Sequence, residues 1–318
     1  MTALPTLLLN SVLPSGNLKH SWIGKCHRLV TKKRMRRLLR LILVTLMLGV
    51  LTCHGVQGAD TRPIRFGMTP AFLHDQHALL AEWRAYLEAR VRRPVEFVQR
   101  DRYQETMDLL QQQKVDFAWI CDYPYLVLKK DVRLMAVALN GGRPTYRSYL
   151  IVPARDTTTQ SVMDLKGRVF AYADIHSNTG YLVPRFEIQK SGANPAKFFK
   201  RTFFTWSHRK AIDAVAAGLA QGAAVDSYVW DVLNKVRPDI TARTRIAWRS
   251  PEYGFPPIVA QRDVFDADFA VMQTVLMNMK NDEQGRVLLA RLKLDGFIAG
   301  SPRLYDGVAD MMRLFGED

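Results

Sequence analysis

The sequence predicts an α/β fold of two lobes, built on mixed, mainly parallel sheets. Segments with the apolar patterns of strands and helices alternate between residues 64 and 139, and the alternation resumes after residue 146. A chain of 318 residues is long enough for two separate hydrophobic cores. Near 148–156 and 246–260 the chain can pass from one lobe to the other, so we expect a hinge of two crossings.

The region after residue 60 begins with a regular alternation of strand and helix signals. Short buried or alternating apolar runs predict strands at residues 64–68, 94–98, 115–120 and 134–139. Apolar residues at helical spacing predict amphipathic helices over 76–91 and 103–113.

A second α/β unit follows. Strands are expected at 146–152, 168–173 and 221–226, with helices starting at Ser177 and covering 211–219. A Pro-rich strand-like segment, 246–259, leads to helices over 269–279 and 283–292. We expect one lobe to comprise 60–150 with 250–318, and the other 151–249. In such folds ligands bind at the carboxyl ends of the strands, between the lobes.

The first 59 residues indicate an export signal. The basic stretch 32–37 precedes an apolar run at 41–51, and small residues near Gly58 suit a signal peptidase. The apolar run is short for a transmembrane helix, so we expect a periplasmic protein with no stable membrane insertion after cleavage. Met35 is a better start than Met1, because residues 1–34 have no clear pattern.

Lipid attachment at Cys53 is the less favoured alternative, because Thr52 is a poor residue before a lipoprotein cysteine. With Cys26 and Cys53 removed, the mature chain keeps a single cysteine, Cys121, which has no partner for a disulfide.

The net charge of +15 belongs mostly to the export signal. Residues 1–58 contain nine Lys or Arg and no Asp or Glu, so the remainder carries only +6. This excess is compatible with an anionic ligand and too small to indicate a nucleic-acid partner.

The run from Asp174 to Tyr181 is the strongest local signal for a binding site. Ser177 suits the N-cap of a helix, and Gly180 permits close approach of a ligand or a neighbouring backbone. Asn178 and Thr179 add amide, hydroxyl and backbone donors at a helix start, where an anion is favoured. Considered alone, the run also fits a plain helix cap.

The order and spacing of several motifs resemble the periplasmic phosphate/phosphite/phosphonate-binding proteins of ABC importers. The motifs are residues 115–119, 146–152, 164–167, 174–181 with Pro184, 198–199, 207–208 and 211–215. The resemblance covers nearly all of the mature chain and implies a type 2 periplasmic binding fold that closes by hinge motion on a small oxyanion. It also implies an ABC permease as partner and no cofactor.

The resemblance places Ser177, Asn178 and His208 at the ligand, with an acidic residue near Asp226. Thr179, Gly180, Tyr123, Thr69 and Phe72 complete the expected ligand set. For His208 the alternative is a helix cap, and for Asp226 it is a solvated strand end.

Two departures from the family pattern concern the ligand. Asn178 replaces a smaller hydroxyl residue, and Cys121-Asp122 follows the strand at 115–120, with Asp122 as the expected N-cap of a helix. A carboxylate facing the site repels a dianion, which makes phosphate itself a poorer candidate than phosphonate or phosphite.

Cys121 allows two interpretations. It can be a small buried packing residue, or it can be a soft ligand for arsenite. Some relatives of this family sense arsenite through a pocket cysteine and signal to a membrane histidine kinase, so a periplasmic sensor is the alternative function.

An enzyme is not expected. Cys121 and His208 could be proposed as nucleophile and base, but no third group at recognisable spacing would orient them. No residues have the spacing of a metal site, apart from Cys121 as a possible arsenite ligand.

Overall fold

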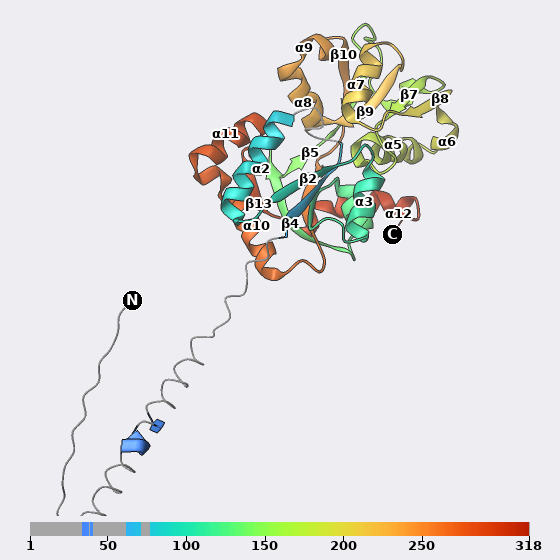
Figure 1. Cartoon of the computed structure of the whole chain (residues 1–318). Coiled ribbons are helices and arrows are strands. Elements are labelled where there is room, and N and C mark those ends of the chain that lie inside the picture. The colour runs from blue at the N-terminus through green and yellow to red at the C-terminus, as the bar shows by residue number, and fades with distance from the viewer. Residues whose placement is uncertain (1–33, 38, 41–61, 71–76, 318) are drawn as a thin grey trace, which may run out of the picture. The chain divides into compact units, whose positions relative to one another are not determined.

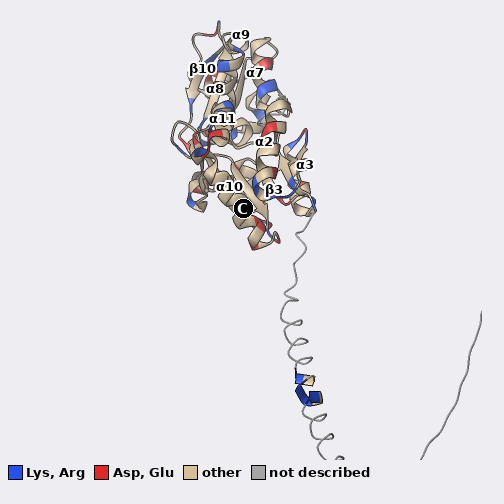
Figure 2. Cartoon of the chain, turned by 60° about the vertical axis from the view of Figure 1, so that its left-hand side comes forward, with Lys and Arg blue, Asp and Glu red and all other residues tan. Residues whose placement is uncertain are grey.

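The computed structural model describes residues 34–37, 39–40, 62–70 and 77–317 (Figure 1). The chain divides into two compact units, Met1–Ala59 and Asp60–Asp318. In the first unit, residues 34–37 and 39–40 are helical, and the helix is rich in arginine (Figure 2). The apolar run and cleavage region of the expected export signal lie outside the described residues. Within the described part, no helix is long and apolar enough to cross a membrane.

The second unit contains two large sheets, which define two lobes. The first lobe has a six-stranded sheet in the order β13-β4-β12-β3-β1-β2. Its strands are β1 (Ile64–Met68), β2 (Val95–Gln99), β3 (Phe117–Trp119), β4 (Val132–Leu139), β12 (Pro257–Gln261) and β13 (Gly296–Ala299).

The second lobe has a five-stranded sheet in the order β10-β6-β9-β7-β8. Its strands are β6 (Ser148–Pro153), β7 (Val169–Tyr172), β8 (Arg201–Phe204), β9 (Gly222–Asp226) and β10 (Thr244–Arg249). Figure 1 shows this sheet with its helices above the first lobe.

The two crossings between the lobes pair with each other. The chain leaves β4 through β5 (Thr145–Tyr146) and returns from β10 through β11 (Tyr253–Gly254), and these two short strands form an antiparallel pair. The two-lobed α/β fold with two crossings is confirmed. The first crossing lies at Thr145–Tyr146, just before the expected 148–156, because β6 of the second sheet already begins at Ser148.

Both sheets are mixed, as expected, but parallel pairs are not the majority. Two of the five pairings in the first sheet and two of the four in the second are parallel. The reason lies in the crossings. Strands β6 and β12 each enter a sheet directly from the hinge and are antiparallel to their neighbours, whereas βαβ connections alone would give parallel pairs.

Helices cover both sheets. In the first lobe they are α2 (His77–Val91), α3 (Tyr103–Gln111), α4 (Asp122–Val127), α10 (Asp266–Asn278), α11 (Glu283–Leu292) and α12 (Asp306–Leu314), with 3-10 turns η3 (Met279–Asn281) and η4 (Pro302–Tyr305). In the second lobe they are η1 (Val162–Leu165), η2 (Asn178–Leu182), α5 (Val183–Lys190), α6 (Pro195–Phe198), α7 (His208–Ala216), α8 (Ser227–Val236) and α9 (Pro238–Thr241).

Aromatic side chains build the core of the first lobe beneath β1 and β3. Trp83 of α2 packs against Phe66, Phe97 and Trp119 with ring centroids 5.9, 5.4 and 5.8 Å apart. Trp83, Phe66 and Trp119 are fully buried. Such packing holds α2 against the sheet and fixes the strand β3 that leads to Cys121 and Asp122.

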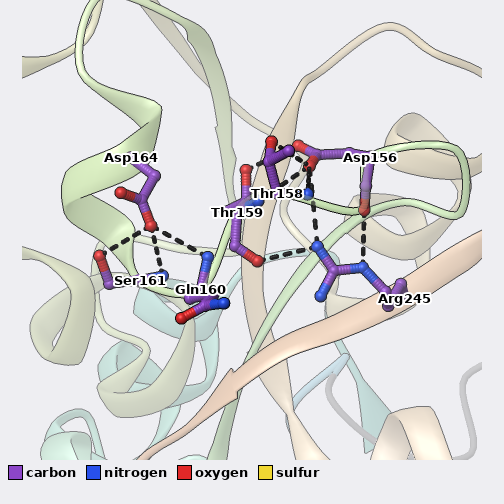
Figure 3. Close-up of polar contacts among 7 residues, drawn as sticks. All are labelled: Asp156, Thr158, Thr159, Gln160, Ser161, Asp164 and Arg245. Carbon is purple, nitrogen blue, oxygen red and sulfur yellow. Dashed lines mark hydrogen bonds and ion pairs between the residues drawn. The ribbon is translucent and has the colours of Figure 1, made fainter.

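The loop after β6 is fixed by hydrogen bonds to the edge strand β10 (Figure 3). Asp156 accepts the main-chain N–H groups of Thr158 and Thr159, both at 3.0 Å. Arg245 of β10 donates to the carbonyls of Asp156 and Thr159 at 2.6 and 2.8 Å. Asp164 closes a capping box with Ser161 at the start of η1. The loop therefore connects β6 rigidly to the rest of the second lobe.

Candidate functional site

Buried polar side chains gather where strands of both lobes end. Cys121 and Asp122 follow β3 of the first lobe, whereas Ser177 follows β7 of the second and Asp226 ends β9. Tyr146 comes from the hinge strand β5. All five are at least 95% buried. Strand ends of neighbouring α/β sheets are the usual place for a ligand, so we call this cluster the interlobe site.

Asp122 is the centre of the interlobe site. Its Oδ1 accepts three hydrogen bonds at 2.9 Å, from the Cys121 thiol, the Tyr123 main chain and the Tyr146 hydroxyl. Its Oδ2 accepts the side-chain amide of Asn178 at 2.7 Å. The last of these bonds joins the two lobes, because Asn178 belongs to η2.

Asp122 is ionised at neutral pH although it is fully buried. Burial raises its pKa to about 6, and the hydrogen bonds from Cys121, Tyr146 and Asn178 oppose that rise. Burial, the charge of Asp122 and the hydrogen bond to it raise the pKa of the Cys121 thiol. Cys121 is therefore a protonated donor to its neighbour, held also by the main-chain N–H of Asn178.

A second network joins Ser177 and His208. The main-chain N–H of Asp226 donates to Nδ1 of His208 at 3.1 Å, so the ring proton is assigned to Nε2. That Nε2 lies 3.2 Å from Oγ of Ser177, which also accepts the N–H of Gly180 at 2.9 Å. Burial lowers the pKa of His208 to about 3, so the imidazole is neutral. With two bonds accepted, the Ser177 hydroxyl keeps its proton for a ligand.

Gly180 is required by the close approach of η2 to His208. A Cβ at this position would lie 2.5 Å from Cβ of Ala173 and 2.9 Å from Cε1 of His208. Ser148 of β6 holds the same turn by donating to the Thr179 carbonyl at 2.7 Å. The turn is π-helical, with the Leu182 N–H bonded to the Ser177 carbonyl, a geometry often found at functional sites.

Asp226 caps α8 by accepting the N–H groups of Tyr228 and Val229 at 2.7 and 3.3 Å. It is 1% exposed, so the alternative of a solvated strand end is wrong. Burial raises its pKa to about 8, and the charge of Asp122 adds to this rise. Asp226 is therefore protonated at neutral pH and can itself donate a hydrogen bond to a ligand.

Several buried polar atoms around these networks have no hydrogen-bond partner in the described part of the chain. They are the Tyr103 hydroxyl, Oδ1 of Asn178, Oγ1 of Thr179 and Nδ1 of His176. Burial raises the pKa of Tyr103, and so do the nearby groups of Cys121, Asp174, Asp226 and Asp122. Because these groups act on its hydroxyl, that hydroxyl lies beside the interlobe site. Unpaired buried polar groups are costly unless something binds them.

The structure brings together most of the expected ligand residues: Cys121, Asp122, Ser177, Asn178, Thr179, Gly180, His208 and Asp226. Thr69 uses its hydroxyl on the Trp119 carbonyl at 3.3 Å. Phe72 lies outside the described residues. Asp122 was expected as the N-cap of α4, but the helix already begins at Asp122, so the N-cap is Cys121.

A contact between the lobes is made by Glu317 and supported by Tyr123. The Tyr123 hydroxyl donates to Oε2 of Glu317 at 2.5 Å within the first lobe, and Oε1 of Glu317 lies 3.4 Å from the guanidinium of Arg185 in the second lobe. A further contact joins the Tyr103 N–H of the first lobe to Asp174 of the second at 3.2 Å. These bonds join the two lobes to each other.

Three residues of the site, Tyr103, Tyr146 and Ser148, were not expected from the sequence. Tyr103 resembles any buried residue at a helix start, and its neighbours are distant along the chain. Within the described residues, no group of three or more His, Cys, Asp or Glu side chains could hold a metal ion.

The Asp122–Asn178 bond can be tested by exchanging the two residues. Asp122→Asn should lower the unfolding free energy by about 1–3 kcal/mol, because an amide cannot accept from all four donors. The double variant Asp122→Asn/Asn178→Asp restores a donor facing a carboxylate and should recover part of this loss. Urea unfolding of the ligand-free wild type, single and double variants measures the coupling. Purely additive losses would contradict a direct bond.

Asp226→Asn should change the pH dependence of stability. The pKa of Asp226 is raised from 3.8 to about 8, so its stabilising contribution is complete below pH 4 and lost as pH rises towards 8. Asparagine keeps the cap and never ionises, so the variant should gain stability relative to wild type as pH rises, as measured by melting temperatures from pH 4 to 8.

Asp239→Asn is the control. The Arg237 hydrogen bond lowers the pKa of exposed Asp239, so this substitution should have the opposite sign and reduce stability at neutral pH. Parallel pH profiles for the wild type and Asp226→Asn would contradict a protonated Asp226.

Comparison with known proteins places the chain in a family. Residues 66–305 match the family model of the ABC transporter phosphonate periplasmic substrate-binding protein. Over 155 residues, the chain is 25% identical to a probable ABC transporter phosphite binding protein, PhnD1, of Prochlorococcus marinus, covering 47% of this chain and 52% of the relative. It is 27% identical over 196 residues to the phosphonates-binding periplasmic protein of Escherichia coli, covering 59% of this chain and 57% of the relative. The chain thus spans little more than half the length of these relatives.

Solved structures agree with the fold. A binding protein component of an ABC phosphonate transporter from Pseudomonas aeruginosa superimposes with a TM-score of 0.74 at 22% identity, covering 80% of this chain and 87% of that chain. PhnD1 of P. marinus in complex with methylphosphonate gives a TM-score of 0.73 at 18% identity, covering 81% and 100%. The type 2 periplasmic binding fold is confirmed.

The matching family consists of substrate-binding proteins of importers, not of enzymes, and its description places its members in the periplasm. The family model covers most of the described second unit, including both sheets and the interlobe site. The chain belongs to the phosphonate-binding periplasmic substrate-binding proteins of ABC transporters.

Proposed function

We propose that this protein captures a small phosphorus oxyanion, a phosphonate or phosphite, between its lobes and delivers it to an ABC importer. The observation that carries the proposal is a set of buried polar groups from both lobes that lack protein partners. The relative from P. marinus was solved in complex with methylphosphonate, a small phosphorus oxyanion.

Neutral donors supply the binding energy. The hydroxyls of Ser177, Thr179 and Tyr103 and the protonated carboxyl of Asp226 can each donate to a ligand oxygen. No Lys or Arg side chain is among the buried residues of the described part. Hydrogen bonds to a charged acceptor are stronger than neutral ones, so such a set can hold an oxyanion without a salt bridge.

Asn178 gives the site a preference for a protonated ligand. Its Nδ2 faces the carboxylate of Asp122, which fixes its Oδ1 as an acceptor without a partner. A phosphonate that retains one proton can donate its P–O–H to this oxygen, whereas a fully ionised one cannot. The nearby charge of Asp122 also repels a dianion more than a monoanion.

Delivery depends on hinge closure. We propose that the two lobes rotate about the β5–β11 pair, and that closure completes the donor set and excludes water. The proposed lobes are 60–150 with 250–318 and 151–249, except that all of β6 (Ser148–Pro153) moves with the second lobe. An ABC permease then recognises the closed form. The basic and apolar stretches of residues 32–51 direct export to the periplasm, with cleavage near Gly58 or Ala59.

The sensor alternative has no support in the geometry. The Cys121 thiol donates to Asp122, and burial raises its pKa, which opposes the thiolate that would bind arsenite. Asp122 and Tyr146 also occupy the space beside the sulfur.

Tyr103→Phe tests the proposed function. The lost hydroxyl has no protein partner, so stability should be unchanged or slightly higher. Methylphosphonate affinity should fall about tenfold, the value of one good hydrogen bond to a charged group. Isothermal titration calorimetry with methylphosphonate and phosphite, alongside urea unfolding, measures both quantities.

Tyr86→Phe is the matched control. The Tyr86 hydroxyl donates to Asp282 at 2.7 Å in the first lobe, away from the interlobe site. This variant should lose about 1 kcal/mol of stability and keep the wild-type affinity. Wild-type affinity in Tyr103→Phe would remove that residue from the site, and no binding of either ligand to wild-type protein would refute the function.

A further inference from the structure

A separate groove lies mainly on the second lobe, beside the edge strand β8 and the helices α5 and α6, and Phe315 of the first lobe lines one side of it. Its volume is about 470 Å³, which is within the range of small-molecule pockets. Residues of the interlobe site such as Asp122, Ser177 and His208 do not line it.

Aromatic rings form one wall of this groove. Tyr172, Tyr181 and Phe204 line it and contact one another. The ring centroid of Tyr172 lies 5.0 Å from that of Tyr181 and 5.6 Å from that of Phe204, and the last two centroids are 5.5 Å apart. Tyr172 is buried behind the other two, which are half-buried and leave apolar surface open to the groove. The mutual contacts fix the rings, so a flat ligand would bind without ordering them.

Cations form the other wall. Arg185, Lys200 and Arg201 line the groove, and no Asp or Glu does. Lys200 and Arg201 are exposed, and neither forms an ion pair with a described residue. The guanidinium of Arg185 lies 4.6 Å from the ring centroid of Tyr181 and also forms an ion pair with Glu317 at 3.4 Å, so Lys200 and Arg201 are the cations left for a ligand.

The charge of the whole lobe favours an anion at this groove. Residues 148–249 contain fifteen Lys or Arg against eight Asp or Glu, so this lobe carries the positive excess of the second unit. A concentration of one charge on one lobe attracts ions of the opposite sign over several ångströms.

We propose that this groove is a second ligand site, which binds a planar aromatic anion of about nucleotide size. The flat ring lies against the aromatic wall, and the anionic group pairs with Lys200 and Arg201. A bare phosphonate leaves the aromatic wall empty, and an uncharged ring leaves the cations unpaired. Both halves of the ligand are therefore required. The proposal does not depend on what the interlobe site binds.

Adenosine 5′-monophosphate is the probe. Calorimetry with the purified protein at low salt should show one site with a dissociation constant below about 1 mM. Adenosine lacks the anion and ribose 5-phosphate lacks the ring, so each should bind at least tenfold more weakly. Saturating methylphosphonate should leave the binding unchanged, which separates this groove from the interlobe site.

Charge reversal locates the site. Lys200→Glu/Arg201→Glu should weaken binding of the probe at least tenfold. Lys235→Glu/Arg243→Glu makes the same change at exposed positions of the same lobe, outside the groove and towards β10 at the opposite edge of the sheet, and should have little effect. Circular dichroism confirms that both variants are folded.

Four results would overturn the proposal. The first three are no binding of adenosine 5′-monophosphate, equal affinity for adenosine or ribose 5-phosphate, and equal weakening by the two charge reversals. Displacement of the probe by methylphosphonate would assign the binding to the interlobe site and overturn the proposal as well.

Discussion

The hydrogen bond between Asp122 and Asn178 is the interaction on which the interlobe site depends. It satisfies a buried carboxylate of one lobe with an amide of the other at 2.7 Å. A buried charge is tolerated only when its oxygens are bonded, so Asp122 constrains the residues around it. The thiol of Cys121, the hydroxyl of Tyr146 and the main chain of Tyr123 supply the remaining donors. The orientation of Asn178, and thus the oxygen that faces a ligand, follows from this requirement.

The site is built from groups that are neutral at the pH of use, with one exception. His208 stays neutral because burial lowers its pKa to about 3, and Asp226 stays protonated because burial raises its pKa to about 8. Asp122 is the one ionised group. An oxyanion binding here would be stabilised by dipoles and hydroxyls, and each added ligand charge would be opposed by Asp122. The proposed selectivity for protonation state would therefore come from the protein's own buried charge.

Local signals made part of this site predictable from the sequence. The cap at Ser177 and the close approach at Gly180 depend on neighbouring residues, and both are present in the structure. The two-lobed fold followed from strand and helix alternation. Tyr103 was not predictable, because its place beside the site results from contacts such as its N–H bond to Asp174, 71 residues away. The excess of antiparallel pairs was missed for a similar reason: the direction of β6 and β12 depends on the hinge.

The proposed hinge motion and the proposed ligand recognition would share residues. Tyr146 belongs to the hinge strand β5, and its hydroxyl is 2.9 Å from Asp122 and 3.4 Å from the amide of Asn178. Opening the lobes must separate Asn178 from Asp122. The carboxylate of Asp122 then has one hydrogen-bond donor fewer, and its pKa rises. Closure without a ligand repairs that bond but leaves the Tyr103 hydroxyl and the Asn178 oxygen unpaired. A ligand that forms hydrogen bonds with both atoms would remove the free-energy cost of leaving them unpaired in the closed form. Such a ligand would stabilise the closed form more than the open form, which is what ligand-driven closure requires.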